Sequence, residues 1–205
     1  MIQALVIGGA FNPPTIAHIE LVNAVRKTIG YDLVVFVPSK QSYIKEDQKK
    51  DYAFSNQARL DMLHAISESR DWMMVCDYEI NLDHQPKTYE TLCHLQKEGI
   101  QGKLLFGSDK LMELEHGWKY IPELCKQFGI VVMKRSGDDV YAMIENDAYL
   151  SSLKQYITVV DTPRMYQMVS SSDVRSLLKD IQANKEALSK ILLPEVMSYL
   201  LEVKK

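Results

Sequence analysis

The stretch that decides the fold is ALVIGGAFNPPTIAHIELVNAV, residues 4–25. It opens with an apolar run over residues 4–7, passes through the adjacent Gly8 and Gly9, and takes on a helical pattern from residue 18. A buried strand, a glycine turn and a helix in succession begin a parallel α/β sheet, in which ligands bind beyond the carboxyl ends of the strands. This stretch therefore predicts the fold class and one side of a phosphate-binding site.

The same alternation continues along the chain. Apolar, β-branched runs predict buried strands at residues 4–7, 33–37, 73–76, 104–106, 130–133 and 157–160. Helical patterns lie at residues 18–29, 55–68, 88–98, 108–126 and 139–155. Alternating strands and helices predict an α/β fold, a Rossmann-like, doubly wound parallel sheet of five to six strands. The longest polar connection, residues 38–52, is typical either of a functional loop or of a solvated one.

The chain becomes wholly helical after the last predicted strand. We interpret residues 1–205 as a single domain, with an α/β core over 1–168 and C-terminal helices over 169–205 that carry a second phosphate-binding motif. The length of 205 residues and the hydrophobic content of 46% suffice for one core.

Bulk properties favour a small-molecule partner. The net charge of −3 gives no basic field for binding nucleic acid or an anionic membrane, so neither is expected as a partner. Three cysteines without a C-x-x-C pair, and the absence of a signal peptide pattern or a run of about 20 apolar residues, predict a cytoplasmic protein. No spacing of histidines with carboxylates or cysteines indicates a metal site. Self-association to a homo-oligomer is left open.

The first motif is GGAFNPPTIAH, residues 8–18. Thr15 is the predicted N-cap of the following helix, which places His18 in the first turn, where its imidazole can face a bound phosphate. The alternative is a buried structural histidine, because His18 shares the spacing of an apolar stripe with Leu21, Val22 and Val25. The motif lacks the third glycine of G-x-G-x-x-G and the Walker ending, which disfavours hydride-transfer and P-loop functions.

The second motif is VSSSDVR, residues 169–175, at the start of the first C-terminal helix. Ser171 is the predicted N-cap, so that Ser171, Ser172 and Arg175 converge on one helix end and form a cradle for an oxyanion. An ordinary capped helix with a surface arginine is the alternative. Two anion-binding helix starts, after the first and the last strand, fit a ligand with several phosphates.

These two motifs resemble the GGxFDPxHxGH-like (T/HxGH) and ISSTxxR-like signatures of the nucleotidyltransferase superfamily, over nearly the whole chain. The closest branch is similar to nicotinate or nicotinamide mononucleotide adenylyltransferase. The resemblance implies transfer of the adenylyl group of ATP to nicotinate (or nicotinamide) mononucleotide, with release of pyrophosphate, in NAD biosynthesis. It also implies Mg²⁺, bound through the ATP phosphates and not by a metal site of the protein.

The resemblance further implies the site residues, through the two motifs and the segments VPSKQSYIK, PKTYETL, LLFGSDKLMEL, HGWKYIPEL and VMKRSG. The implied catalytic residues are His18, Lys45 and Arg175. The implied ATP-binding residues are Gly8, Gly9, Ala10, Phe11, Thr15, His18, Gly107, Asp109, Ser170, Ser171, Ser172 and Arg175. The implied acceptor-binding residues are Asn12, Lys45, Thr88, Trp118 and Arg135, with Trp118 stacking on the pyridine ring and Asp109 contacting a ribose.

The chain departs from the family pattern at several positions. Asn12 replaces an aspartate, Thr15 a histidine, Ala17 a glycine and Ser172 a threonine, and Lys87 stands where the pyridine-recognition segment usually has tyrosine. Two alternative functions follow. Phosphopantetheine adenylyltransferases, or other small-molecule nucleotidyltransferases, share the Thr-x-x-His form of the first motif. A non-catalytic nucleotide sensor would tolerate the changes at Ala17 and Lys87.

Overall fold

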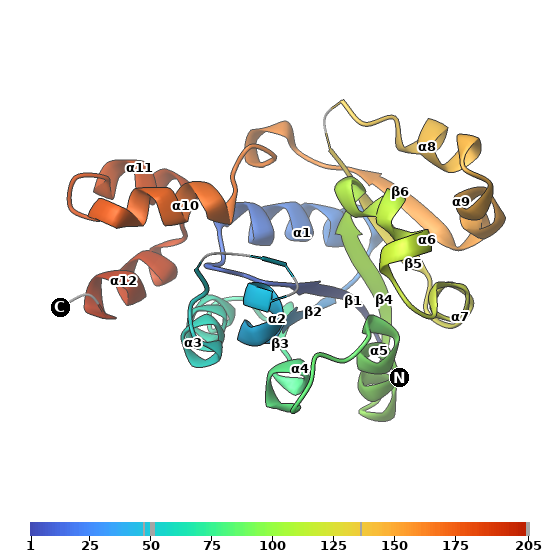
Figure 1. Ribbon diagram of the computed structural model, residues 1–205, viewed down its shortest axis with the longest axis horizontal. Helices are drawn as coiled ribbons and strands as arrows, with labels where there is room; N and C mark the ends of the chain where they lie inside the picture. Colours follow the sequence, from blue (N-terminus) through green and yellow to red (C-terminus); the bar gives the residue numbers. More distant parts are fainter. Residues whose placement is uncertain (47, 50–51, 136, 204–205) are drawn as a thin grey trace.

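The computed structural model describes residues 1–46, 48–49, 52–135 and 137–203. Its centre is a six-stranded parallel sheet with the order β3-β2-β1-β4-β5-β6 (Figure 1). The strands are β1 (Ile2–Gly9), β2 (Leu33–Pro38), β3 (Met73–Val75), β4 (Ile100–Gly107), β5 (Ile130–Lys134) and β6 (Ile157–Asp161). The predicted doubly wound α/β fold is confirmed. The order reverses between β1 and β4, so a ligand crevice is expected beyond the carboxyl end of β1.

Alternation along the strands divides the core into two layers. Leu5 and Ile7 of β1 face a cluster that includes α1, α3 and the C-terminal helices, whereas Ala4 and Val6 face a cluster that includes α5, α7, α8 and α9. Because both faces are covered, the strands are apolar almost throughout. The helices of the two layers are α1 (Ile16–Ile29), α3 (Asn56–Ser67), α5 (Thr88–Lys97), α7 (Ile121–Gln127), α8 (Val140–Asn146) and α9 (Ala148–Leu153).

Short helical segments connect these elements. They are α2 (Gln41–Glu46), α4 (Tyr78–Asn81), α6 (Leu114–Gly117) and the 3-10 turns η1 (Ser108–Glu113), η2 (Lys154–Tyr156) and η3 (Arg164–Tyr166). The polar connection over 38–52 thus contains one helix, α2; Asp47, Lys50 and Asp51 lie outside the described residues.

Two predicted helices are wrong in their extent. The stretch 108–126 is divided into η1, α6 and α7, because Tyr120 takes a left-handed conformation with a φ of 61° and Pro122 lies in the first turn of α7. The stretch 139–155 is divided at Asp147, whose carboxylate accepts a hydrogen bond of 2.8 Å from the backbone N–H of Leu150 and begins α9. A proline and an N-cap each start a new helix, although the apolar spacing continues across both.

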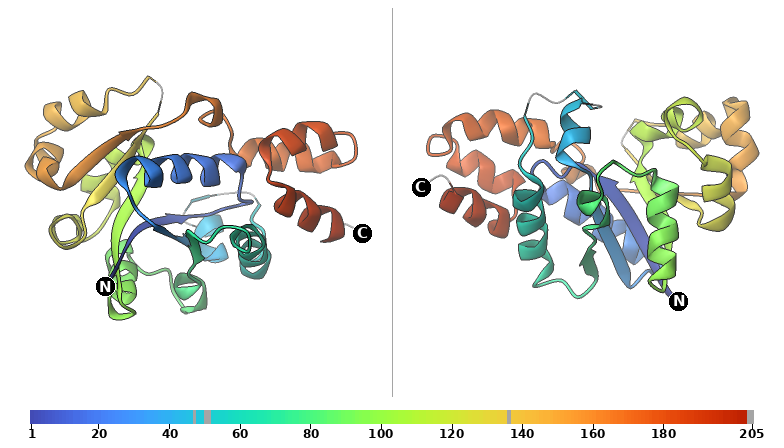
Figure 2. Two further views of the ribbon diagram at one scale, coloured as in Figure 1. Left: turned by 180° about the vertical axis from the view of Figure 1, so that it is seen from behind. Right: turned by 60° about the horizontal axis from the view of Figure 1, so that its bottom comes forward.

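The C-terminal segment packs beside the sheet against α3 (Figure 2). It comprises α10 (Ser171–Leu177), η4 (Leu178–Asp180), α11 (Lys185–Ile191) and α12 (Pro194–Val203). Its apolar residues, including Val174, Leu188 and Val196, belong to the same core cluster as Leu5 of β1. An ion pair of 2.8 Å joins Arg70 to Glu195. The position of α10 therefore depends on the core that it shares with the sheet.

Within the part of the chain that the structure describes, we find no helix with the length and apolar character needed to cross a membrane.

Candidate active site

The turn after β1 brings backbone, not side chains, to the end of the strand. Phe11 has a φ of 43° and is buried, with its ring close beneath the turn. A Cβ atom on Gly9 would lie 3.3 Å from this ring, so position 9 has little room for a side chain. The two glycines place backbone without side chains at the carboxyl end of β1, as expected for Gly8 and Gly9. The contacts of Gly8, Gly9, Ala10 and Phe11 with ATP stay a prediction.

Asn12 is buried, and each end of its side-chain amide has a backbone partner. Nδ2 donates to the carbonyl of Tyr52 at 2.8 Å, and Oδ1 accepts from the backbone N–H of Phe54 at 2.9 Å. An aspartate, the usual residue of the resembling motif, could accept the second bond but could not donate the first. Asn12 thus fastens the turn to residues 52–54, and its direct contact with an acceptor stays a prediction.

Thr15 and His18 form the start of α1. Thr15 is the N-cap, as predicted, and its backbone N–H donates to Nδ1 of His18 at 3.0 Å, while its hydroxyl lies 2.8 Å from the same nitrogen. Because Nδ1 accepts, the neutral imidazole carries its proton on Nε2. Burial and then the positive charge of Arg135 lower the pKa of His18 from 6.5 to about 4.

His18 is therefore a neutral donor at physiological pH. None of the hydrogen bonds between described residues uses its Nε2. The ring is half-buried and packs edge-on against Phe11, with 5.2 Å between centroids. The structural and the functional interpretation of His18 are thus compatible, because packing and Thr15 fix one edge of the ring and leave the other nitrogen for a phosphate oxygen.

The second motif docks directly onto the first. Nη1 of Arg175 donates to the carbonyl of Asn12 at 2.8 Å, and the hydroxyl of Ser171 donates to the carbonyl of Pro13 at 2.8 Å. Nη2 of Arg175 also donates to the Ser172 hydroxyl at 2.9 Å. Figure 1 shows the start of α10 beside the start of α1. The two helix starts, which the sequence assigns to one ligand with several phosphates, therefore lie in direct contact in the structure.

The predicted N-cap of α10 is wrong by one residue. Ser170, with an extended backbone, is the N-cap, and its hydroxyl accepts from the backbone N–H of Asp173 at 3.2 Å. Ser171 is already helical, and its hydroxyl is used for the contact with Pro13. Three consecutive serines have equal local preference for the cap, so the long-range contact decides which of them begins the helix.

The ends of β4 and β5 supply a carboxylate and a guanidinium. Oδ1 of Asp109 lies 3.4 Å from Nη2 of Arg135. A Cβ on Gly107 would come within 2.5 Å of Oδ1 of Asp109 and 3.4 Å of Nε of Arg135, so a side chain at this position would displace the Asp109 carboxylate. Ser108, which sequence reasoning missed, is buried; its hydroxyl accepts from the backbone N–H of Arg135 at 3.1 Å and donates to the Asp138 carboxylate.

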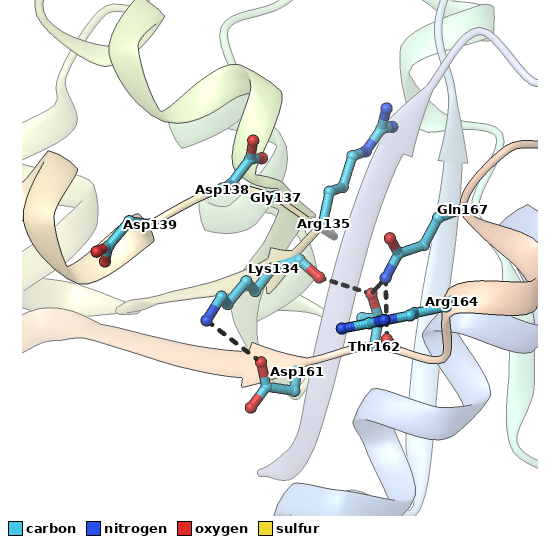
Figure 3. A pocket seen from close by; sticks show the side chains of 9 residues that line it. All are labelled: Lys134, Arg135, Gly137, Asp138, Asp139, Asp161, Thr162, Arg164 and Gln167. Atoms are coloured by element: carbon cyan, nitrogen blue, oxygen red, sulfur yellow. Dashed lines mark hydrogen bonds and ion pairs between the residues drawn. The ribbon is translucent and has the colours of Figure 1, made fainter.

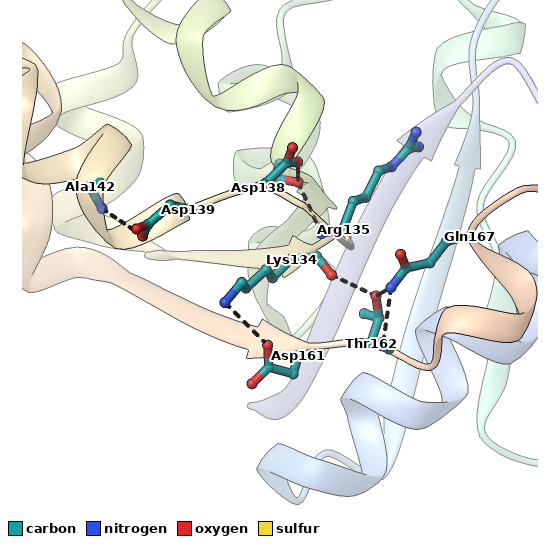
Figure 4. Close-up of polar contacts among 9 residues, drawn as sticks. Lys134, Arg135, Asp138, Asp139, Ala142, Asp161, Thr162 and Gln167 are labelled. Carbon is teal, nitrogen blue, oxygen red and sulfur yellow. Dashed lines mark hydrogen bonds and ion pairs between the residues drawn. The ribbon is translucent and has the colours of Figure 1, made fainter.

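A polar cleft of about 370 Å³ lies beyond β5 and β6 (Figure 3). Its lining residues are Lys134, Arg135, Gly137, Asp138, Asp139, Asp161, Thr162, Arg164 and Gln167. The Thr162 hydroxyl donates to the Lys134 carbonyl at 2.7 Å, and Nε2 of Gln167 donates to the carbonyl and the hydroxyl of Thr162, each at 2.9 Å (Figure 4). Only Arg135 was predicted among these residues. The mixed charges and hydrogen-bonding groups of this cleft suit a polar ligand.

Three predicted residues lie on elements around this centre. Lys45 is exposed in the last turn of α2, Thr88 is the first residue of α5, and Trp118 follows α6. The half-buried indole of Trp118 packs on Phe106 of β4, with 5.7 Å between ring centroids. None of the hydrogen bonds, ion pairs or ring contacts between described residues joins these three side chains to the two motifs, so their roles stay predictions.

A further residue that sequence reasoning missed is Arg59 of α3. It is fully buried, and its guanidinium reaches the carbonyl of Ala10 in the first motif at 2.8 Å. A signal was available, because Arg59 precedes Met62, Leu63 and Ile66 by three, four and seven residues and so occupies the buried stripe of its helix.

Comparisons with known proteins agree with this geometry. Residues 6–177 match the cytidylyltransferase-like family. A probable nicotinate-nucleotide adenylyltransferase of Aquifex aeolicus is 35% identical over 135 residues, which are 65% of this chain and 77% of the relative. A nicotinamide/nicotinic acid mononucleotide adenylyltransferase of Arabidopsis thaliana is 29% identical over 188 residues, 85% of this chain and 79% of the relative.

The fold is shared with a solved enzyme. The structure of Plasmodium falciparum nicotinic acid mononucleotide adenylyltransferase complexed with NaAD superposes with a TM-score of 0.74, covering 100% of this chain and 97% of the other, at 16% identity. With the two docked motifs and the family match, the conclusion is that this chain is a nucleotidyltransferase of the cytidylyltransferase-like family, on the branch of the nicotinate-nucleotide adenylyltransferases.

Proposed function

We propose that the protein transfers the adenylyl group of ATP to the phosphate of nicotinate mononucleotide, or of its amide, and releases pyrophosphate, as a step of NAD biosynthesis. The observation that carries this proposal is the contact between the two motifs, Arg175 to Asn12 and Ser171 to Pro13. It brings two helix starts, with their free amides, to one place beyond the sheet, and such a pair suits several phosphates. The names of the relatives support the choice of acceptor.

In this reaction a phosphate oxygen of the mononucleotide attacks the α-phosphorus of ATP. The new bond joins that oxygen to the α-phosphorus, and the bond from the α-phosphorus to the bridging oxygen breaks, so that pyrophosphate departs with the electron pair. No side chain needs to act as a nucleophile. His18 would donate from Nε2 to the transferred group, and Arg175 would bind the outgoing phosphates, which stabilises the charge of the transition state.

The polar groups around the two motifs suit phosphate better than a metal ion. They are amides, hydroxyls, an imidazole and guanidinium groups, and Asp109 is already paired with Arg135. No group of three or more His, Cys, Asp or Glu side chains among the described residues is arranged to hold a metal. We therefore propose that Mg²⁺ enters with ATP, held by the phosphates, and neutralises their charge there.

The acceptor side is proposed to include Trp118, whose indole would stack on the pyridine ring, with Lys45, Thr88 and Arg135 around the mononucleotide. We place the reaction in the cytoplasm. The three cysteines, all among the described residues, are unpaired, as suits a reducing compartment.

Measuring pyrophosphate release from ATP and Mg²⁺ with a panel of acceptors tests the proposal. Nicotinate or nicotinamide mononucleotide should yield the corresponding dinucleotide, identified by mass. Product with phosphopantetheine alone would contradict the proposed acceptor but keep the reaction class. Tight ATP binding without product from any acceptor would instead establish a nucleotide sensor.

A further inference from the structure

Arg59 makes a set of hydrogen bonds that joins the exits of the first two strands. Nη1 donates to the carbonyl of Ala10 at 2.8 Å, and Nη2 donates to the carbonyl of Ser39 at 2.6 Å and to Oδ1 of Asn56 at 2.8 Å. Nε donates to the carbonyl of Phe54 at 3.3 Å. Ala10 belongs to the turn after β1 and Ser39 follows β2, so one guanidinium holds both loops at the ligand end of the sheet.

All of these partners are neutral. The Arg59 side chain is completely buried, and no carboxylate of the described residues lies within ion-pair distance of it. Burial lowers the pKa of Arg59 to about 10, which still leaves it protonated at neutral pH. Buried charges in proteins are ordinarily paired, because an unpaired charge is costly to remove from water. A buried cation that has no carboxylate partner among the described residues, and that bonds to the carbonyl of the residue after Gly9, thus needs an explanation.

We propose that Arg59 is a positioning residue for the adenylyl transfer and that its charge, which no carboxylate of the described residues pairs, attracts the phosphates of the bound nucleotide from beneath the turn after β1. The inference rests on the proposed function, because it takes a nucleotide phosphate as the missing anion. The low-dielectric surroundings transmit the charge to the site, and the neutral carbonyl partners do not cancel it. The same bonds hold the backbone around Ala10 in place before ligand binds.

Asn56 offers a way to test the charge without removing the arginine. Its Oδ1 accepts from Nη2 of Arg59 and, at 2.8 Å, from the backbone N–H of Gln41. Asn56→Asp keeps an acceptor for both bonds and adds a carboxylate that pairs with Arg59. Asn56 is also the first residue of α3, where a negative charge is favourable, so the fold is expected to keep its stability.

A matched control exists on α1. Oδ1 of Asn23 accepts from Nε of Arg26 at 3.2 Å, and Arg26 packs over Trp72, at the opposite end of its helix from the first motif. Asn23→Asp therefore makes the same chemical change beside another arginine, with the same change in net charge. Both variants and the wild type are titrated calorimetrically with inorganic pyrophosphate and with adenosine, and melting temperatures are recorded.

We expect Asn56→Asp to weaken pyrophosphate binding about tenfold, because the added carboxylate offsets the attraction of Arg59 for the phosphates, and to leave adenosine binding within about twofold of the wild type. Asn23→Asp should leave both affinities unchanged. Equal pyrophosphate affinity in Asn56→Asp and the wild type, or equal weakening of both ligands, would overturn the inference.

Arg59→Lys and Arg59→Met provide a second test that does not depend on Asn56. The lysine variant keeps the charge but loses the planar guanidinium that donates to several carbonyls at once. It should therefore bind pyrophosphate nearly as the wild type does, while kcat falls because the turn after β1 is less well held. The methionine variant should lose about tenfold in pyrophosphate affinity. Equal losses of pyrophosphate affinity in the lysine and methionine variants would contradict a role of the Arg59 charge in phosphate binding. A wild type that binds pyrophosphate but forms no dinucleotide would disprove the proposed function and leave this comparison valid.

Discussion

At the scale of single residues, His18 shows how a side chain can be fixed by packing and still keep one nitrogen available for a ligand. Thr15 hydrogen-bonds to Nδ1 and Phe11 packs against the ring, so the orientation of the proton on Nε2 is fixed. The low pKa keeps the ring neutral, so it can donate this proton in a hydrogen bond without carrying a charge. A donor that needs no rearrangement during the reaction is the kind of group that lowers a barrier.

We predict that His18→Ala lowers kcat by about 100- to 1000-fold, the usual loss for one preorganised donor, while the affinity for ATP changes little. Steady-state kinetics with both substrates and calorimetric titration of ATP measure the two effects. A variant that melts at lower temperature but turns over at a near-normal rate would show instead that the histidine serves packing alone.

The same histidine predicts how stability depends on pH. Its pKa is about 4 in the folded protein and 6.5 when exposed. Between these values the unfolded chain binds more protons, so the free energy of unfolding decreases as the pH falls through this window. The loss should reach up to about 3 kcal/mol below pH 4 and be absent in His18→Gln. Denaturant unfolding of both proteins from pH 7 to 4 measures the difference; parallel curves would contradict the assigned neutral state.

At the scale of elements, α10 and the segment around Trp118 are placed by different contacts and should serve different substrates. Arg175 lies on α10, whose start contacts the first motif. Trp118 lies between α6 and α7 and packs on Phe106 of β4. A guanidinium grips phosphate oxygens with charge-assisted bonds, and an indole offers a face to a flat ring.

Substitution of these two residues should therefore change the KM values of different substrates. We expect Arg175→Ala to raise the KM for ATP with little change for the mononucleotide, and Trp118→Ala to do the reverse, by roughly 10-fold if stacking contributes 1–3 kcal/mol. Initial rates with each substrate varied in turn provide the measurement. Equal defects toward both substrates in Trp118→Ala, together with a lower melting temperature, would assign this indole to the core.

At the scale of the whole molecule, the C-terminal helices and the sheet share one apolar cluster, which includes Leu5, Val174 and Leu188. Tyr199 also donates from its hydroxyl to the Asp61 carboxylate at 3.3 Å, and Arg70 pairs with Glu195, so α12 is tied to α3. Since α10 carries the second of the two motifs, the placement of that motif depends on contacts made far from it. We propose on this ground that residues 1–205 unfold as one unit.

Leu188→Ala tests this dependence, because its side chain is fully buried in α11. The substitution should lower the free energy of unfolding by about 2–5 kcal/mol, as for other buried leucines, and should also raise the KM for ATP through a displaced α10. Circular dichroism and tryptophan fluorescence should report a single coincident transition in both proteins. Two separate transitions would show that the C-terminal helices form an independent unit.

Much of this protein was determined by local sequence. The strands, the doubly wound class, the cap at Thr15 and the two motifs follow from short patterns, because strand burial and helix capping depend on a few neighbouring residues. The strand order and the breaks in the stretches 108–126 and 139–155 did not follow, because apolar spacing alone does not distinguish one helix from two that share a face.

Only the tertiary structure decided how the motifs meet. The bond from Arg175 to Asn12 joins residues 163 positions apart, and the choice of Ser170 over Ser171 as N-cap depends on the contact of Ser171 with Pro13. The sequence places Arg59 on the buried stripe of its helix, but only folding supplies its guanidinium with carbonyl partners from two separate loops. Such roles arise from partners brought together by folding, which no short pattern specifies, because the free energy of a buried polar group depends on the groups that surround it.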